Sequence, residues 1–391
     1  MDALTTPSNW QQVRLGDVGK PCMCKRVMKH QTTRYGEIPF YKIGTFGNTA
    51  DAFISKKLFL EYKTKYSFPK KGDILISASG TIGRAVIYDG KPAYFQDSNI
   101  VWIDNDETLV KNDFLFYAYS NIKWNTEHTT ILRLYNDNFR NTLIPLPPLN
   151  EQIAIANILS DVDHYLCSLD ALILKKESVK KALSFELLSQ RKRLKGFNQA
   201  WQRVRLGDIC EITTGSLDAN EMVHYGKYRF YTCAKEYYFI DKYAFDTEAI
   251  LISGNGAYVG YVHYYKGKFN AYQRTYVLDN FSEHIIFIKY FLTMFLQSYI
   301  QTNKNEGNTP YIVMATLKDF EIFLPPLNEQ SAIANILSAL DSEIISLKNK
   351  KRQFENIKKA LNHDLMSAKI RVLKKINAPK VKDKPAYKGN P

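Results

Sequence analysis

The sequence contains one stretch twice. Residues 146–163 read LPPLNEQIAIANILSDVD, and residues 324–341 read LPPLNEQSAIANILSALD. Fifteen of these 18 aligned positions are identical. A shorter repeat lies upstream of each copy, with WQQVRLGDV at residues 10–18 and WQRVRLGDI at residues 201–209. The order of these repeats predicts two tandem copies of a domain followed by a helix.

Each long repeat is expected to end a strand and begin a helix. Proline forces its predecessor into an extended conformation, yet it is tolerated in the first turn of a helix. The two prolines at 147–148 and at 325–326 therefore predict where each helix begins. Asn150 is expected to cap the first helix, and Glu151 suits the positive end of the helix dipole.

Beyond these prolines, the apolar residues follow alternating steps of four and three. The positions are Ile155, Leu159, Val162, Leu166 and Leu169 in the first copy, and Ile333, Leu337, Leu340, Ile344 and Leu347 in the second. Such spacing is the seam of a coiled coil, so the two helices are predicted to pack on each other. Lys351 and Lys358 interrupt the seam, and looser packing is expected there. An amphipathic helix lying on its own domain is the alternative.

These signals predict an α+β chain with two tandem mixed α/β domains, each followed by a long helix. The predicted boundaries are 1–146 and 197–324 for the domains, 147–196 and 325–370 for the helices, and 371–391 for a basic, disordered tail. The domains share a strand with a glycine turn, ILISASGTIG at 74–83 and ILISGNGAYVG at 250–260. The most apolar window, residues 284–300, is too short to span a bilayer and predicts a core helix.

Charge and cysteine content narrow the class of protein. The 53 Lys and Arg residues exceed the 39 Asp and Glu residues, giving a net charge of +14 that favours a polyanionic partner. The five cysteines are odd in number and irregularly spaced, so no disulfide framework is predicted. No basic-then-apolar leader opens the sequence, and we expect a protein of the reducing cytoplasm.

No motif of a self-contained enzyme is complete. An amino-methyltransferase needs a glycine-rich cofactor loop and an Asn/Asp-Pro-Pro-aromatic motif, whereas Asn308-Thr309-Pro310-Tyr311 lacks the second proline. No Walker A sequence occurs. Asp51 with residues 61–63 fits a nuclease spacing only loosely. Cys22-x-Cys24 with His30 lacks a fourth zinc ligand, so we predict neither catalytic nor metal-binding residues.

Basic and amide side chains in both domains predict contact with nucleic acid. Arg and Lys match phosphates and guanine edges, while Gln can pair with adenine. These residues either cluster after the first strand of each domain or follow its glycine turn. The candidates are Lys25, Arg26, Lys29, Arg34, Arg84 and Gln96 in the first domain, and Lys227, Arg229, Lys235, Gln273 and Arg274 in the second.

The whole arrangement resembles the specificity subunits of type I restriction–modification enzymes. The resemblance rests on V-R-L-G-D at 13–17 and 204–208, on G-D-I-L-I-S-x-x-G-T-I-G at 72–83, and on P-P-L-x-E-Q at 147–152 and 325–330. It implies two target-recognition domains that each read half of a split site in double-stranded DNA. It also implies that the two long helices form an antiparallel coiled coil and that catalysis lies outside this chain.

The resemblance further implies partners. Two modification subunits would methylate adenine N6 with S-adenosylmethionine, and restriction subunits with motor activity would use ATP and Mg²⁺, so no cofactor and no membrane is expected for this chain. Two alternatives stay open. One is the specificity subunit of a type IIB-like system with a fused methyltransferase and nuclease, and the other is a coiled-coil scaffold that binds only protein.

Overall fold

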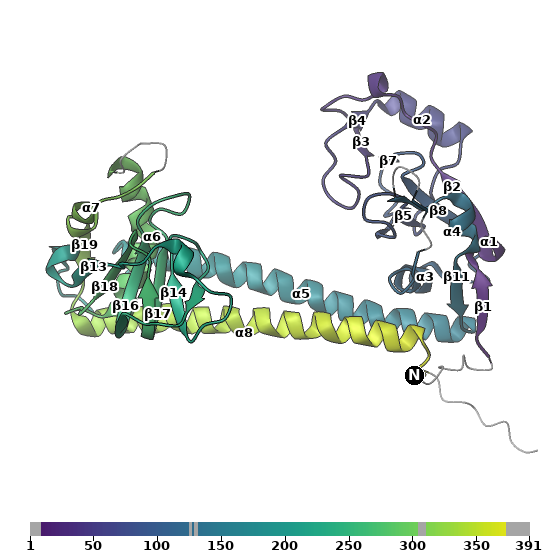
Figure 1. The fold of residues 1–391 in the computed structure, drawn as a ribbon. Coiled ribbons are helices and arrows are strands. Elements are labelled where there is room, and N and C mark those ends of the chain that lie inside the picture. The colour runs from purple at the N-terminus through teal and green to yellow at the C-terminus, as the bar shows by residue number, and fades with distance from the viewer. Residues whose placement is uncertain (1–8, 125–126, 129–131, 304–309, 373–391) are drawn as a thin grey trace, which may run out of the picture. The chain divides into compact units, whose positions relative to one another are not determined.

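A computed structural model of the chain describes residues 9–124, 127–128, 132–303 and 310–372. The chain divides into two compact units. Unit 1 combines residues up to Ser168 with those from Lys351 onward, and unit 2 is Leu169–Lys350. Two 40-residue helices, α5 (Leu149–Leu188) and α8 (Leu327–Met366), each contribute one part to both units (Figure 1). The predicted α+β chain with two mixed α/β domains and two long helices is confirmed.

Unit 1 is built on a four-stranded sheet with the order β2-β8-β5-β6 and a three-stranded sheet with the order β4-β3-β7. The strands are β2 (Gly19–Met23), β3 (Ile38–Tyr41), β4 (Phe53–Ile54), β5 (Ile74–Ser77), β6 (Ala85–Ile87), β7 (Tyr94–Phe95), β8 (Ile100–Asn105), β9 (Glu127–His128) and β10 (Leu132–Arg133). The helices are α1 (Leu15–Val18), η1 (Lys29–Gln31), α2 (Lys56–Lys65), α3 (Asn112–Tyr119) and α4 (Asn136–Asn141). Helix α3 contacts β5 and β6, and its buried Phe114 and Leu115 join the core of the four-stranded sheet.

Unit 2 is built on one six-stranded sheet with the order β13-β18-β16-β17-β14-β15. Its strands are β13 (Glu211–Thr214), β14 (Tyr228–Tyr231), β15 (Tyr238–Ile240), β16 (Phe245–Ser253), β17 (Val262–Ala271) and β18 (Thr275–Asp279). The shorter helices are η2 (Leu206–Asp208), η3 (Ala219–Glu221) and α7 (Met314–Lys318). Helix α6 (Ile285–Asn303) contacts β16 and β17 and buries Phe287 and Ile300, which confirms the predicted core helix.

No helix in the described part of the chain combines the length and apolar character that a membrane span requires.

The short and long repeats of the sequence meet in a two-stranded sheet in each unit. Strand β1 (Gln11–Arg14) pairs with β11 (Leu143–Leu146) in unit 1. Strand β12 (Gln202–Arg205) pairs with β19 (Glu321–Leu324) in unit 2. Both pairs are antiparallel and have the same register, with Gln11 opposite Leu146 and Gln202 opposite Leu324. The two repeats of each half therefore form a single structural element that leads into the long helix.

The long helices pack antiparallel within each unit. In unit 1, Asp163 pairs with Lys358, and the ring of Tyr165 lies 4.6 Å from that of Phe354. In unit 2, Lys176 pairs with Glu343 and Lys180 with Asp341. Residue numbers thus rise along α5 as they fall along α8. Every predicted seam position is buried or half-buried, which confirms the seam.

Both long helices end earlier than their sequence predicts. The first was expected to reach Lys195-Gly196, but α5 ends at Leu188. Gln190 adopts a left-handed φ of 61°, and Ala368 does the same after α8 with a φ of 55°. A glycine at such a position would have signalled the end of the helix, and here the residue is not glycine. The helix also starts one residue before Asn150, whose side chain accepts a hydrogen bond from the Glu151 amide inside the first turn.

The first residue of the predicted tail belongs to unit 1. The side chain of Arg371 binds Glu151 and Asn9 there. Residues 373–391, which carry the rest of the predicted tail, lie outside the described part of the chain.

Candidate nucleic-acid interface

The glutamate of each long repeat joins three parts of its unit. Glu329 is fully buried and accepts hydrogen bonds from the indole of Trp201 at 3.2 Å and from the guanidinium of Arg193 at 2.5 and 3.1 Å. Buried Glu151 accepts the same bonds from Trp10 at 3.1 Å and from Arg371 at 2.7 and 2.9 Å. A buried carboxylate requires such charge-assisted partners. The hydrogen bond between them therefore explains why both halves carry this glutamate and this tryptophan.

The glutamine that follows clamps the backbone beside each helix start. Gln152 donates to the carbonyls of Leu109 and Pro147 and accepts from the amide of Lys111. Gln330 donates to the Pro325 carbonyl and to Glu283, and it accepts from the His284 amide. Each glutamine thereby ties the helix start to the segment that leads into α3 or α6.

About three turns further along each long helix, an aspartate forms a second repeated network. Asp163 accepts from Tyr117 at 2.8 Å and pairs with Lys358 at 2.5 Å. Asp341 accepts from Tyr290 at 2.6 Å and pairs with Lys180. At Lys358, where looser packing was predicted, the ammonium pairs with the Asp163 carboxylate and lies 5.6 Å from the Tyr117 ring centre.

These networks change the acid–base behaviour of their members. Burial and the bond to Asp163 raise the pKa of Tyr117, and burial and the bond to Asp341 raise the pKa of Tyr290. Burial opposes ionisation of Asp341. Hydrogen bonds from Lys180 and Tyr290 outweigh it and hold the pKa of that carboxyl below its usual value.

Each network takes its carboxylate from one copy of the repeat and its cation from the other. In unit 1 the carboxylates Glu151 and Asp163 belong to the first copy, and their cations follow or lie on α8. In unit 2 the carboxylates belong to the second copy, and Lys180 and Arg193 come from the first. Each copy of the repeat therefore supplies the cations for the carboxylates of the other copy.

The glycine turn of each domain is tight, as predicted. Gly83 and Gly260 have φ angles of 82° and 83°, and a Cβ on either would lie within 2.5 Å of Trp124 or Ile300. Both turns close with a hydrogen bond from the amide of the last glycine, Gly83 or Gly260, to the carbonyl of Ser77 or Ser253. The extra residue in the second turn has a consequence: Ser77 Oγ bonds the carbonyl of Thr81, whereas buried Ser253 Oγ has no partner among the described residues.

In unit 1 the structure brings several predicted residues to one cavity of about 520 Å³. Arg26, Lys29 and Gln96 line it, together with Lys42 and Arg133. Arg26 pairs with Asp97 at 2.8 Å, and Gln96 Oε1 accepts from the amide of Ile43 at 3.0 Å. The charge of Arg26 is thus partly offset, and the acceptor of Gln96 is already used inside the domain.

The other three predicted residues of unit 1 lie on the surface. Lys25 has its ammonium 5.0 Å from the ring centre of Tyr66. Arg34 is exposed. Arg84 donates to the carbonyl of Gly47 at 3.3 Å. A Cβ at Gly47, where φ is 73°, would lie 2.9 Å from that guanidinium, so the glycine makes room for the arginine.

In unit 2 the predicted residues surround a group of aromatic rings. The Arg229 guanidinium carbon lies 4.2 Å from the ring centre of Tyr237 and 4.5 Å from that of Tyr265. Lys235 lies 5.0 Å from the Tyr258 ring. The carbonyl of Arg274 accepts from the thiol of Cys233. Exposed side chains also occur at Lys227, Gln273 and Arg274.

Sequence reasoning missed the residues that complete these surfaces. Lys42 and Arg133 join the unit 1 cavity from segments far apart in sequence. In unit 2 the rings of Tyr237 and Tyr265 pack against the guanidinium of Arg229. Alternation along β17 was a usable signal for Tyr265, because it places this ring on the same face as buried Phe269.

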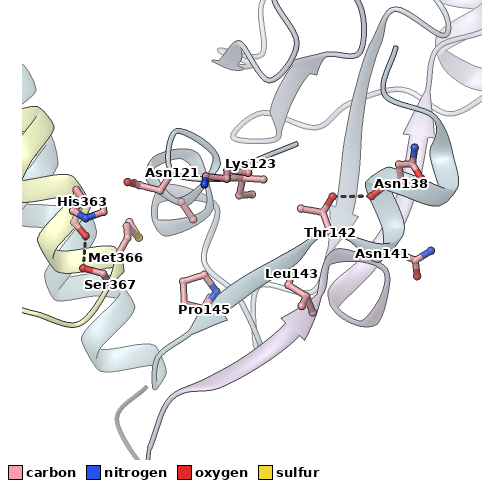
Figure 2. A pocket seen from close by; sticks show the side chains of 12 residues that line it. Asn121, Lys123, Asn138, Asn141, Thr142, Leu143, Pro145, His363, Met366 and Ser367 are labelled. Atoms are coloured by element: carbon pink, nitrogen blue, oxygen red, sulfur yellow. Dashed lines mark hydrogen bonds between the residues drawn. The ribbon is translucent and has the colours of Figure 1, made fainter. Parts of the chain in front are cut away.

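Two further cavities occupy equivalent places in the two units. The first, of about 570 Å³, lies between the end of α8, the segment after α3, and β11 (Figure 2). Leu143 and Pro145 line it from β11, and Met366 lines it from α8. The second, of about 520 Å³, lies between helix α6, strand β19 and the end of helix α5. It is lined by Leu188 and by several aromatic rings, including that of Phe323.

The residues weighed for metal or nuclease chemistry have other partners. Burial raises the pKa of the Cys24 thiol to about 12, which disfavours the thiolate that binds metal. Asp51 pairs with Lys42, and Glu61 pairs with Lys65. Within the described residues, no group of three or more His, Cys, Asp and Glu side chains is placed to hold a metal ion.

Comparison with known proteins places both halves in one family. The family described as "Type I restriction modification DNA specificity domain" matches residues 7–176 and again residues 198–356. A putative type I restriction enzyme specificity subunit of Haemophilus influenzae is 64% identical over 148 residues, which is 38% of each chain. The EcoDI specificity subunit of Escherichia coli is 38% identical over 43% of this chain and 37% of its own. These two matches thus span little more than a third of those relatives.

A third relative matches along nearly the whole chain. The MjaVIII specificity subunit of Methanocaldococcus jannaschii is 27% identical over 95% of both chains. Among solved structures, the S subunit of a type I restriction–modification system from M. genitalium has a TM-score of 0.62, 18% identity, and coverage of 93% of this chain and 98% of its own. That likeness shows the shared fold. With the family matched in both halves, the chain belongs to the type I restriction–modification DNA specificity subunits.

Proposed function

We propose that this chain is the DNA-recognition subunit of a type I restriction–modification complex and performs no catalysis itself. Each domain reads one half of a bipartite site in double-stranded DNA. The observation that carries the proposal is the DNA specificity domain found twice, on a scaffold whose buried networks are built by exchange between the two copies. Two similar domains on one scaffold suit a target with two half-sites.

The DNA contacts are assigned to the basic residues of both domains. These are Lys25, Arg26, Lys29, Arg34, Arg84, Lys227, Arg229, Lys235 and Arg274, together with Gln96 and Gln273. The unit 1 cavity supports this assignment, because four basic side chains line it. The proposed recognition domains keep the boundaries 1–146 and 197–324, and each is followed by one of the long helices, α5 or α8.

The partners in this proposal supply the chemistry. Two modification subunits use S-adenosylmethionine to methylate adenine N6, and restriction subunits use ATP and Mg²⁺. The equivalent cavities beside β11 and β19 are the proposed contacts for one modification subunit each, because both present exposed apolar side chains such as Leu143 and Phe323. The complex acts on DNA and is placed in the cytoplasm.

Binding to duplex DNA tests the function, with the full chain and its modification partner present. Replacing Lys25, Arg26 and Lys29 by alanine should weaken binding to all duplexes, because phosphate contacts carry no sequence information. The slope of log affinity against log salt should become shallower by about 0.9 for each phosphate that is no longer neutralised. Alanine at Lys20, Lys56 and Lys57, three exposed lysines of the same unit, is the charge-matched control.

The outcomes separate the possible functions. An unchanged slope in the variant of Lys25, Arg26 and Lys29 would show that this segment faces away from DNA. Absence of any DNA binding by the wild-type complex would favour a scaffold that binds only protein. Methyl transfer from labelled S-adenosylmethionine by the purified chain alone would contradict the non-catalytic role.

A further inference from the structure

The two faces of the six-stranded sheet in unit 2 have different surroundings. Ile250, Ile252 and Leu278 pack with α6 on one face. A small separate cluster on the other face contains Leu251, Phe269, Val277 and Tyr231. Arg229 lies two residues before Tyr231 on β14. Because side chains alternate along a strand, Arg229 lies on the face away from α6.

On that face, three tyrosines hold the Arg229 guanidinium. Its carbon lies 4.2 Å from the ring centre of Tyr237 and 4.5 Å from that of Tyr265. Nη1 donates to the hydroxyl of Tyr231 at 3.4 Å. Tyr231 is only 2% exposed and contacts Tyr265 and Phe269, so the support is itself fixed by the core. Tyr237 is 41% exposed, which places the cluster at the surface.

The supporting groups leave the charge of Arg229 intact. Arginines such as Arg26 and Arg193 are each paired with a carboxylate. Within the described parts of the chain, Arg229 has no carboxylate partner, and its Nε and Nη2 atoms donate to no protein group. Neutral rings thus fix the orientation of a full positive charge that still has free donors.

We propose that Arg229 reads a guanine in the half-site of the second domain, with Tyr237 and Tyr265 as positioning residues. The inference rests on the proposed DNA-recognition function. Guanine presents two acceptors, O6 and N7, in the major groove, and the planar guanidinium can donate to both at once. A bidentate contact with a phosphate carries no sequence information, whereas a base edge with two acceptors turns the fixed orientation that the rings supply into discrimination between bases.

Selection from a random duplex library tests this assignment, with the full chain and its modification partner. Arg229→Lys keeps the charge but lacks the planar fork. It should relax one G·C position of one half-site by about 5- to 150-fold. The other half-site should stay unchanged and so reports that the complex is folded. Arg229→Ala should relax the same position.

Variants of the supporting ring separate positioning from simple packing. Tyr237→Phe keeps the ring and should keep selectivity at that position. Tyr237→Ala should relax it as Arg229→Lys does, with little change at the other positions. Lys268→Ala is the control, because Lys268 lies beside Tyr243 on the opposite face of the sheet and should leave the selected motif unchanged.

Several results would overturn the assignment of Arg229. These are a wild-type half-site without a G·C pair, an Arg229→Lys variant with unaltered selectivity, and loss of selectivity spread evenly over the whole half-site, which marks a structural role. Selection of no motif at all by the wild-type complex would instead reject the proposed function. The two failures are therefore distinguishable.

Discussion

The residues that the two repeats share most strictly include buried polar groups. Glu151 and Glu329 each bind a tryptophan and an arginine from segments far away in the sequence. The sequence assigns Glu151 only to the helix dipole, because a local rule uses local neighbours. The arginine partners lie after the far end of the other helix, and only the antiparallel packing brings them close.

Removing the charge of Glu329 should therefore be costly. Glu329→Gln keeps the shape and an acceptor for Trp201, but it leaves Arg193 without its carboxylate. We expect the free energy of unfolding to fall by about 2–4 kcal/mol, a little below the range for a fully buried pair because Arg193 is partly exposed. Urea unfolding of the full chain measures this change.

A matched surface pair gives the control. Glu321→Gln removes the partner of Arg203 on the exposed side of the same unit and should cost about 0–1 kcal/mol. Equal decreases in the free energy of unfolding of the two variants would show that the buried ion pair of Glu329 stabilises the fold no more than the exposed pair does.

Among the elements, the long helices are the part that the sequence predicts best. Their starts and seam follow from proline placement and 4–3 spacing, and both are confirmed. Pairing across the seam was not predictable, because equivalent positions carry different chemistry. Lys176 and Glu343 form an ion pair in unit 2, while Phe354 and Tyr165 at the matching positions form a ring pair in unit 1.

The Asp341 network should make the packing of unit 2 sensitive to acid. Asp341 on α8 faces Lys180 on α5 and Lys289 and Tyr290 on α6. Its pKa is lowered in the folded state, so its contribution is present above the unfolded pKa of about 3.9 and is lost as pH falls through the folded pKa. Asp341→Asn should cost about 1–3 kcal/mol at neutral pH, since the carboxyl is partly exposed.

Unfolding of both proteins across pH measures this dependence. The stabilities of wild type and Asp341→Asn should converge in acid, because the protonated aspartate resembles asparagine. A constant difference at every pH would mean that the charge of Asp341 does not stabilise the network.

For the whole molecule, the repeats predict the scaffold but not the recognition surfaces. Arg26 and Lys29 are close in sequence and line the same cavity, whereas Arg133 reaches this cavity from a distant segment. Gln96 was predicted only from its residue type, and its side-chain oxygen also accepts a hydrogen bond from the Ile43 amide. Residue type alone does not reveal whether a polar group is used inside the fold, and the interiors of the two domains share too little sequence to inform each other.

The repeated scaffold also presents the same kind of cavity twice, which leads to a prediction about stoichiometry. One cavity is lined by Leu143 of β11, which is 57% exposed, and the other by Phe323 of β19, which is 44% exposed. Two modification subunits should bind each chain, one in each unit. Light scattering of the complex at saturation measures this number directly, and a single bound subunit would contradict the two-site proposal.

Variants with one altered cavity sharpen the test. Phe323→Asp places a charge where an apolar contact is expected and should weaken binding in unit 2 by at least about tenfold, leaving one tightly bound subunit. Leu143→Asp should do the same in unit 1, and the double variant should bind neither subunit tightly. Leu60→Asp alters a similarly exposed leucine on α2, away from β11. This control variant should still bind two modification subunits. If Phe323→Asp and Leu143→Asp also retain two subunits at wild-type affinity, the partner does not contact these cavities. Two subunits on wild type and one on either single variant would show that each copy of the repeat carries its own docking surface.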